Sequence, residues 1–182
     1  MPIDFNLMFL ASQRFENGEA FRGAFLITDN NTTPLEFRCT SPVRPTNLQK
    51  TLYGRILEQH IVINLIGLPL IRSPKNKFNL ILVREPLFLE LRPHIDIPML
   101  RIFKDTEDDS VTGEKPLLIS SESGKFEPVL IAAHHEFVDE REIMRASLND
   151  IFQRRSLLEP FERIAIALNQ VHDQKVGEGK GE

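Results

Sequence analysis

The chain lacks most features of a secreted or membrane protein. Its 182 residues include a single cysteine, Cys39, so no disulfide can form within the chain. The sequence starts without the basic segment and long apolar run of a signal peptide. No stretch reaches the roughly 20 apolar residues that cross a bilayer as a helix. These absences predict a cytoplasmic protein with no membrane partner.

The chain is also short of the residues that build a nucleic-acid surface. It has no tryptophan and one tyrosine, and its 22 basic residues are outnumbered by 26 acidic ones, which gives a net charge of −4. Binding to a polyanion grows with the number of phosphates that Lys and Arg neutralise, and unpaired bases stack on aromatic rings. Nucleic acid is therefore not expected as the main partner.

Recognised catalytic motifs are missing as well. Gly124 and Lys125 lack the earlier glycine and the following Ser or Thr of a phosphate-binding loop, and no G-x-S-x-G turn occurs. Cys39 falls on the apolar side of an alternating segment, which favours a buried and inert thiol. We therefore expect no catalytic residue and no cofactor from known motifs.

The composition that is present suits one globular domain. Apolar residues make up 41% of the chain and charged residues 26%, as in ordinary soluble proteins. The closing VGEGKGE has no apolar anchor. We expect a single α+β domain over residues 1–175 and a disordered tail over 176–182.

Short apolar or alternating runs predict the strands. They lie at residues 3–10, 21–28, 35–40, 78–83, 87–91, 98–103, 117–120 and 128–133. The turn residues Asp29, Asn30 and Asn31 predict that the second and third strands form a hairpin. Glu36 and Arg38 should be neighbours on its exposed face.

Three helices are expected. Thr46 and Gln49 fit a capping box, followed by apolar residues at Leu48, Leu52 and Ile56. Two further helices should begin near Asp139 and Pro160. Because strands come first and helices last, the sequence predicts an α+β fold. It would have a mainly antiparallel sheet, one internal helix and two C-terminal helices, with the helices on one face.

The stretch AAHHEFVDE holds the strongest candidate for a metal site. His134, His135 and Glu136 are all metal-capable, and HEFVD resembles H-E-x-x-H with Asp in the last place. However, the preceding residues predict a strand, on which the two histidines would point to opposite faces. The alternative is a polar strand end that leads into a capped helix.

A second candidate is RPHIDIP. His94 and Asp96 would share one face of a strand and could join His134, His135 and Glu136 in a metal site. The alternative is a solvated turn, favoured by the flanking Pro93 and Pro98.

Two segments carry a resemblance to a known family. The pattern G-x-F-L-x-T-D…P-L-E-F-R…P…L-Y-G, over residues 23–54, and LLEPFERIAIAL, over 157–168, are similar to a family of uncharacterised bacterial proteins. The resemblance implies a bacterial origin and one shared architecture, and it supplies no activity, ligand or site residue.

Two functions follow as alternatives. The lack of a coherent site favours a non-catalytic accessory or interaction protein. It would act through a protein partner or as a homo-oligomer, in a multi-gene bacterial system of the antiviral defence type. The alternative is a metal-dependent hydrolase or nuclease, with His135 and Glu136 as catalytic residues and His94, Asp96 and His134 as metal ligands.

Overall fold

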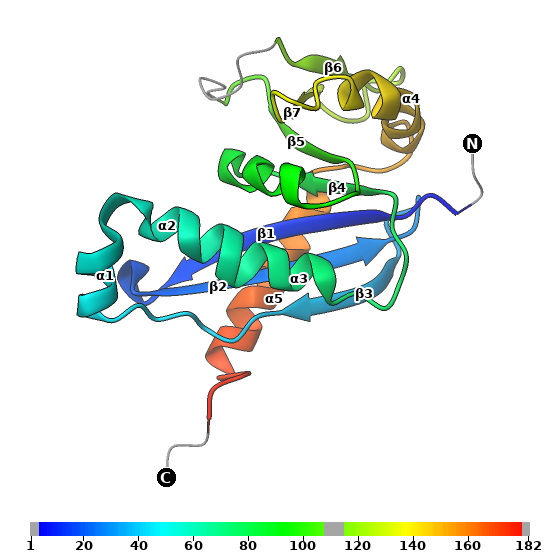
Figure 1. Ribbon diagram of the computed structural model, residues 1–182. Helices are drawn as coiled ribbons and strands as arrows, with labels where there is room; N and C mark the ends of the chain where they lie inside the picture. Colours follow the sequence, from blue (N-terminus) through cyan, green and yellow to red (C-terminus); the bar gives the residue numbers. More distant parts are fainter. Residues whose placement is uncertain (1–3, 108–114, 180–182) are drawn as a thin grey trace.

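A seven-stranded sheet runs through the molecule in the order β3-β2-β1-β4-β5-β7-β6 (Figure 1). The computed structural model describes residues 4–107 and 115–179. The strands are β1 (Leu7–Phe15), β2 (Ala20–Thr28), β3 (Pro34–Cys39), β4 (Leu80–Val83), β5 (Met99–Lys104), β6 (Leu117–Ile119) and β7 (Val129–Ala133).

The sheet is mixed, so the prediction of a mainly antiparallel sheet is wrong. β1, β2 and β3 form an antiparallel meander, and β5, β7 and β6 are also antiparallel, but β1, β4 and β5 run parallel. Parallel neighbours need a crossover, and helical segments supply it on each occasion. One of these is the 3-10 helix η4 (Pro86–His94), where residues 87–91 had been predicted as a strand.

The segment between β3 and β4 is a chain of short helical pieces. They are α1 (Asn47–Tyr53), the 3-10 helix η2 (Gly54–Ile56), α2 (Leu57–Gln59), the π-helix η3 (His60–Gly67) and α3 (Leu68–Arg72). The capping box of Thr46 and Gln49 is present. The apolar residues that follow it in the expected helix, Leu48, Leu52 and Ile56, are exposed. Burial begins at Ile61.

Helices cover both faces of the sheet, contrary to the prediction of one covered face. The predicted C-terminal helices α4 (Glu140–Phe152) and α5 (Glu159–Asp173) pack on the face that carries Phe9. The η3, α3 and η4 segments pack on the opposite face, which carries Met8 and Leu10. Successive side chains of a strand point to opposite faces, so a strand covered on both sides is apolar at every position.

A buried arginine joins the end of α5 to the sheet. The Arg22 side chain donates from Nε to His172 Nδ1 at 2.9 Å and from Nη1 to the carbonyl oxygens of Thr40 and Val176, at 3.1 and 2.8 Å. Glu178 pairs with Arg44.

The division between a domain and a tail at residue 175 stays a prediction, and residues 180–182 lie outside the described part. No helix in that part is long and apolar enough to cross a membrane.

The predicted hairpin of β2 and β3 is confirmed. Asp29 Oδ1 accepts hydrogen bonds from the backbone N–H groups of Asn31 and Thr33, at 2.8 and 2.9 Å. Glu36 and Arg38 are paired at 2.8 Å, as expected. Glu36 also accepts hydrogen bonds from the turn before β4, which fixes the hairpin to that turn.

Replacing Glu36 should make stability less sensitive to acid. Burial acts to raise the pKa of Glu36, but hydrogen bonds from Asn76, Lys75 and Arg38 outweigh it and lower the pKa to about 2. The stabilisation from this carboxylate is therefore complete above the unfolded-state pKa and is lost as pH falls through about 2. We expect Glu36→Gln to lower the free energy of unfolding by about 1 kcal/mol at neutral pH. In thermal unfolding across pH, the deficit should shrink as the pH is lowered; an undiminished deficit would contradict this role.

Gly23 in β2 lets η3 approach the sheet. A Cβ at this position would overlap the Ile66 Cγ2 methyl and lie 3.1 Å from Leu70 Cδ1. We expect Gly23→Ala to lower the free energy of unfolding by about 1–3 kcal/mol, measured by urea denaturation. The loss should be smaller in an Ile66→Leu background, which has no Cγ2 methyl. An equal loss in both backgrounds would exclude this contact as the cause.

Candidate functional site

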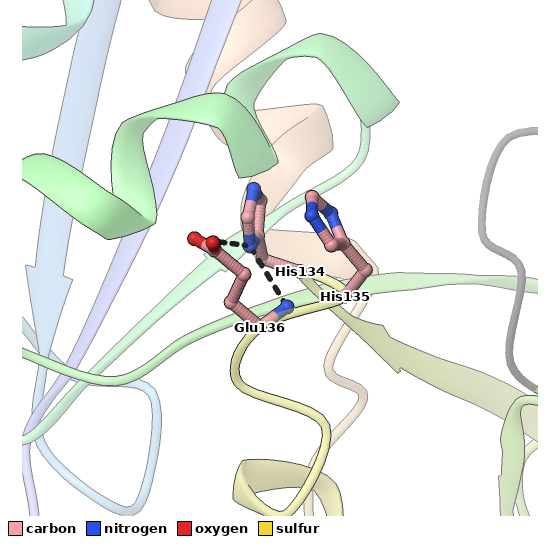
Figure 2. Close-up of side chains that lie close together, drawn as sticks. All are labelled: His134, His135 and Glu136. Atoms are coloured by element: carbon pink, nitrogen blue, oxygen red, sulfur yellow. Dashed lines mark hydrogen bonds and ion pairs between the residues drawn. The ribbon is translucent and has the colours of Figure 1, made fainter.

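The structure brings three of the predicted site residues together. His134, His135 and Glu136 lie in the turn between β7 and α4 (Figure 2), and one ligand atom of each lies within 4.8 Å of the others. The two imidazole rings are 4.2 Å apart between centroids. The expectation that they point to opposite faces fails because β7 ends at Ala133, one residue before them.

Burial differs within this cluster. His134 is buried, and its Nδ1 accepts a hydrogen bond of 3.2 Å from the backbone N–H of Glu136. Its Nε2 lies 3.9 Å from a carboxylate oxygen of Glu90. His135 and Glu136 are exposed. Imidazole and carboxylate donors in this combination suit zinc or a similar transition metal.

His94 and Asp96 do not join this cluster. Both are exposed, at and just after the end of η4, and the three-donor group contains neither. Within residues 4–107 and 115–179, His134, His135 and Glu136 form the one group of three such donors. The structure thus brings together the candidate residues of AAHHEFVDE, and those of RPHIDIP do not join them.

A different cavity lies at the carboxyl ends of the parallel strands. From β1 the chain continues to β2 and β3 on one side, while β4 and β5 lie on the other, so the strand order reverses between β1 and β4. In open sheets with parallel strands, ligands bind beyond the carboxyl ends at such a switch point. The cavity there has a volume of about 370 Å³, and we call it the switch-point cavity. Its lining includes Ala11, Ser12, Gln13, Arg84, Glu85, Pro86, Glu107, Phe161, Ile164, Ala165 and Leu168.

Glu85 and Ser12 meet in this cavity. The Ser12 hydroxyl lies 3.0 and 2.9 Å from the two carboxylate oxygens of Glu85, and the Ser12 N–H donates to the same carboxylate at 3.3 Å. Burial raises the pKa of Glu85 despite these hydrogen bonds, and the neighbouring charge of Glu58 adds to the rise. Glu85 is therefore a carboxyl group suited to taking up and releasing a proton nearer neutral pH than an exposed glutamate.

Two ion pairs flank Glu85. Arg84 pairs with Glu107, and Arg14 pairs with Glu58 from α2. Glu58, Ser12 and Glu85 also line a smaller adjoining cavity of about 250 Å³. Arg84 Nε is buried and has no hydrogen-bond partner among the described residues. The acids of this site do not form a three-donor metal group in the described part of the chain.

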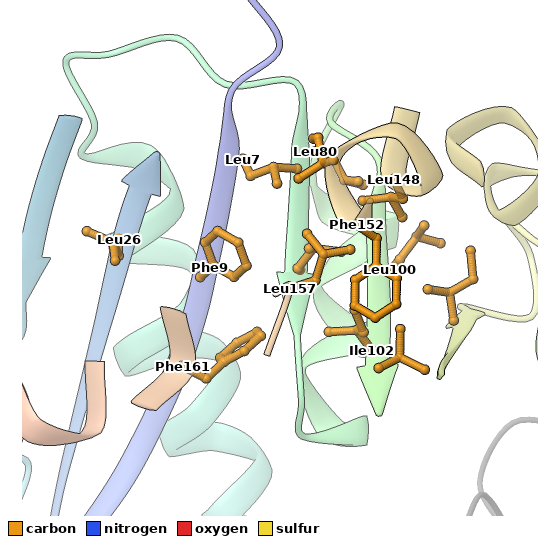
Figure 3. Close-up of a cluster of buried hydrophobic side chains, with 14 of the residues drawn as sticks. Leu7, Phe9, Leu26, Leu80, Leu100, Ile102, Leu148, Phe152, Leu157 and Phe161 are labelled. Carbon is orange, nitrogen blue, oxygen red and sulfur yellow. The ribbon is translucent and has the colours of Figure 1, made fainter. Parts of the chain in front are cut away.

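Helix α5 closes one wall of the switch-point cavity. Its Phe161 ring packs edge-to-face on Phe9 of β1, with 5.3 Å between centroids (Figure 3). Ile164, Ala165 and Leu168 continue the wall along the helix. This wall of the cavity is therefore apolar, which is typical of ligand cavities.

Comparisons with known proteins show where this fold occurs. No family model matches the chain, and no curated protein sequence matches it. Among solved structures, human ENDOV is similar, with a TM-score of 0.57 and 13% identity over 98% of this chain and 89% of that one. Endonuclease V from Streptomyces avermitilis has a TM-score of 0.54 and 15% identity over 81% and 74%. Endonuclease V from Bacillus subtilis has a TM-score of 0.52 and 12% identity over 95% and 83%. At these identities, the similarity establishes a shared fold.

This finding overturns three expectations. The similar structures named above are those of Endonuclease V and human ENDOV, and this finding contradicts the interpretation as a non-catalytic accessory protein that acts through a protein partner. The accessory-subunit role in a defence system is wrong with it. The expectation that nucleic acid is an unlikely main partner is also wrong. It rested on overall charge, which does not report how charges are distributed over a surface.

The cluster of His134, His135 and Glu136 stays a predicted metal site. We expect a divalent transition metal such as zinc to bind the full chain and raise its melting temperature. Isothermal titration calorimetry should show this binding lost in His135→Ala, which removes one donor without disturbing buried His134. His94→Ala is the matched control, because His94 is exposed and outside the cluster, and it should bind as the unaltered chain does. Equal binding by both variants would contradict the site.

Proposed function

We propose that this chain is a hydrolase that acts on nucleic acid, with the switch-point cavity as its reaction site. The observation that carries the proposal is the partly buried Glu85 carboxyl group, held by Ser12 at the carboxyl end of β4. The fold shared with Endonucleases V supports the choice of nucleic acid as substrate.

The chemistry follows from the groups in the cavity. Glu85 takes a proton from a water molecule as the water oxygen attacks the phosphorus of a phosphodiester. The bond from phosphorus to the leaving oxygen breaks, and that oxygen takes a proton from solvent. A base with a raised pKa is more effective in this step than an ordinary carboxylate. The Ser12 hydroxyl fixes the orientation of the Glu85 carboxyl group.

Arg84 is placed to hold the phosphate. It lines the cavity next to Glu85, and its buried Nε is free of partners among the described residues. A guanidinium N–H that lacks a partner can donate a charge-assisted hydrogen bond to a phosphate oxygen. Arg84 would thereby also offset the negative charge that builds up on the phosphate oxygens during attack.

Glu85→Gln tests the proposal directly. The amide keeps the shape of the side chain but cannot accept the proton of the attacking water. We expect the cleavage rate of labelled DNA and RNA strands to fall by about 10²- to 10⁴-fold, the usual contribution of a general base. Gel analysis of the products under single-turnover conditions measures this rate.

Glu122→Gln serves as the control, since Glu122 is an exposed acid away from the cavity, and it should cleave at the unaltered rate. The rate of the unaltered chain should rise with pH through the raised pKa of Glu85, and this rise should be absent in Glu85→Gln. Full activity of Glu85→Gln, or no cleavage of any strand by the unaltered chain, would refute the proposed reaction.

A further inference from the structure

A second hollow lies beside the start of α5. It has a volume of about 560 Å³ and lies between the β2–β3 turn, the β6–β7 connection and the loop that joins α4 to α5. We call it the cationic groove. Its lining includes Asn31, Lys125, Arg154, Arg155, Glu159 and Arg163.

The groove is positive although the chain as a whole carries a net charge of −4. Four cations line it against one carboxylate, that of Glu159, which pairs with Arg163 at 2.6 Å. Arg154 pairs with Asp150 at 3.0 Å, outside the groove lining. A concentration of one sign of charge in a hollow attracts oppositely charged ligands.

Two of these cations are available to a ligand. Lys125 and Arg155 form no ion pair with any residue in the described part of the chain. The Arg155 Nε donates to the carbonyl oxygen of Asn31 at 3.1 Å, which positions its guanidinium at the groove. The terminal nitrogens of that guanidinium can then donate in pairs to phosphate oxygens.

Helix α5 connects the groove with the switch-point cavity. Arg163 lines the groove, and Leu168 lines the cavity. Leu168 follows Arg163 by five positions, which corresponds to about 7.5 Å of helix axis at 1.5 Å per residue. The switch-point cavity is lined by one arginine, Arg84, against the two acids Glu85 and Glu107, so it attracts a polyanion poorly. A nucleic-acid strand that is cleaved in this cavity needs a positive surface nearby.

We infer that the cationic groove binds the phosphodiester backbone of the nucleic-acid strand whose neighbouring segment enters the switch-point cavity. This inference rests on the proposed function. Phe126 borders the groove but packs on Phe152 with 5.5 Å between ring centroids, and Lys125 lies over its ring at 5.3 Å. The Phe126 ring is therefore already in contact with two side chains, and we expect the groove to contact phosphates instead of stacking on bases.

The experiment compares two double variants of the full chain that remove the same charge. Lys125→Ala/Arg155→Ala changes the groove, and Arg72→Ala/Lys77→Ala removes two exposed cations elsewhere. Fluorescence anisotropy with a labelled single-stranded DNA measures the dissociation constant over a range of salt concentrations. We expect the groove variant to bind at least about tenfold more weakly. For this variant, the slope of log affinity against log salt concentration should be shallower by about 1.4, because two phosphate contacts are lost.

Three results would overturn the inference: no weakening in the groove variant, an equal weakening in the control variant, or competition by inorganic phosphate as effective as by unlabelled strand. The last would indicate a site for free phosphate. Thermal unfolding checks that the variants fold. If the groove variant does not, Lys125→Glu, which keeps the contact between Arg155 and Asn31, should weaken binding in the same way.

The two proposals can fail separately. Normal binding by Glu85→Gln together with unaltered cleavage would refute the reaction at Glu85 and leave the groove intact. Cleavage and binding at the unaltered level in the groove variant would refute the groove and leave the reaction intact.

Discussion

The parallel pairing of β1 with β4 is the constraint on which the site depends. Leu10 is opposite Val83 in this pair. Continuing both strands by two residues brings Ser12 beside Glu85, which is where the two side chains bond. A shift of one residue would turn one strand over relative to the other, because side chains alternate between faces, and would exchange the β1 side chains that pack in the two cores. The packing on the two faces therefore fixes the position of Glu85.

The same arrangement places the reacting carboxyl group and the phosphate-binding surface at different positions on the molecule. At the carboxyl ends of the parallel strands, acids and arginines nearly balance, and burial keeps the pKa of Glu85 raised. The positive surface lies at the start of α5, where the loop after α4 meets the β2–β3 turn. Because α5 also packs on Phe9, one helix supports the core, the cavity wall and one side of the groove. Phosphate binding in the cationic groove can then be strong without the groove cations lowering the pKa of Glu85, the carboxyl group that must accept a proton.

Local patterns in the sequence predicted local structure well. The turn at Asp29, the pairing of Glu36 with Arg38 and the capping box of Thr46 each depend on residues close in sequence, and all three are present. The parallel pairs were missed because both crossovers are irregular: β1 connects to β4 through β2, β3 and a chain of short helical pieces, and β4 connects to β5 through the 3-10 helix η4. Leu87 and its neighbours have the apolar character of a strand but follow Pro86, which starts η4. Strand direction depends on such connections and leaves little trace in periodicity.

The site was predicted in part. His134, His135 and Glu136 were identified because metal-binding residue types adjoin in sequence, and the turn after β7 brings them together. Glu85 was missed because its partner Ser12 lies 73 residues away. One signal could have identified it: Arg84 and Glu85 come directly after the buried run of β4, where a polar pair marks the carboxyl end of a strand.

The most direct measurement is the position of nucleic acid on the protein. A photoreactive side chain at Ala165, an exposed residue in the wall of the switch-point cavity, can be compared with one at Ile143, an exposed residue of α4. After irradiation with a labelled DNA strand, denaturing gels report the crosslinked fraction at each position. Strong crosslinking at Ala165 and little at Ile143 is the predicted result. Equal crosslinking at both positions, or none at Ala165, would contradict the placement of the substrate in the switch-point cavity.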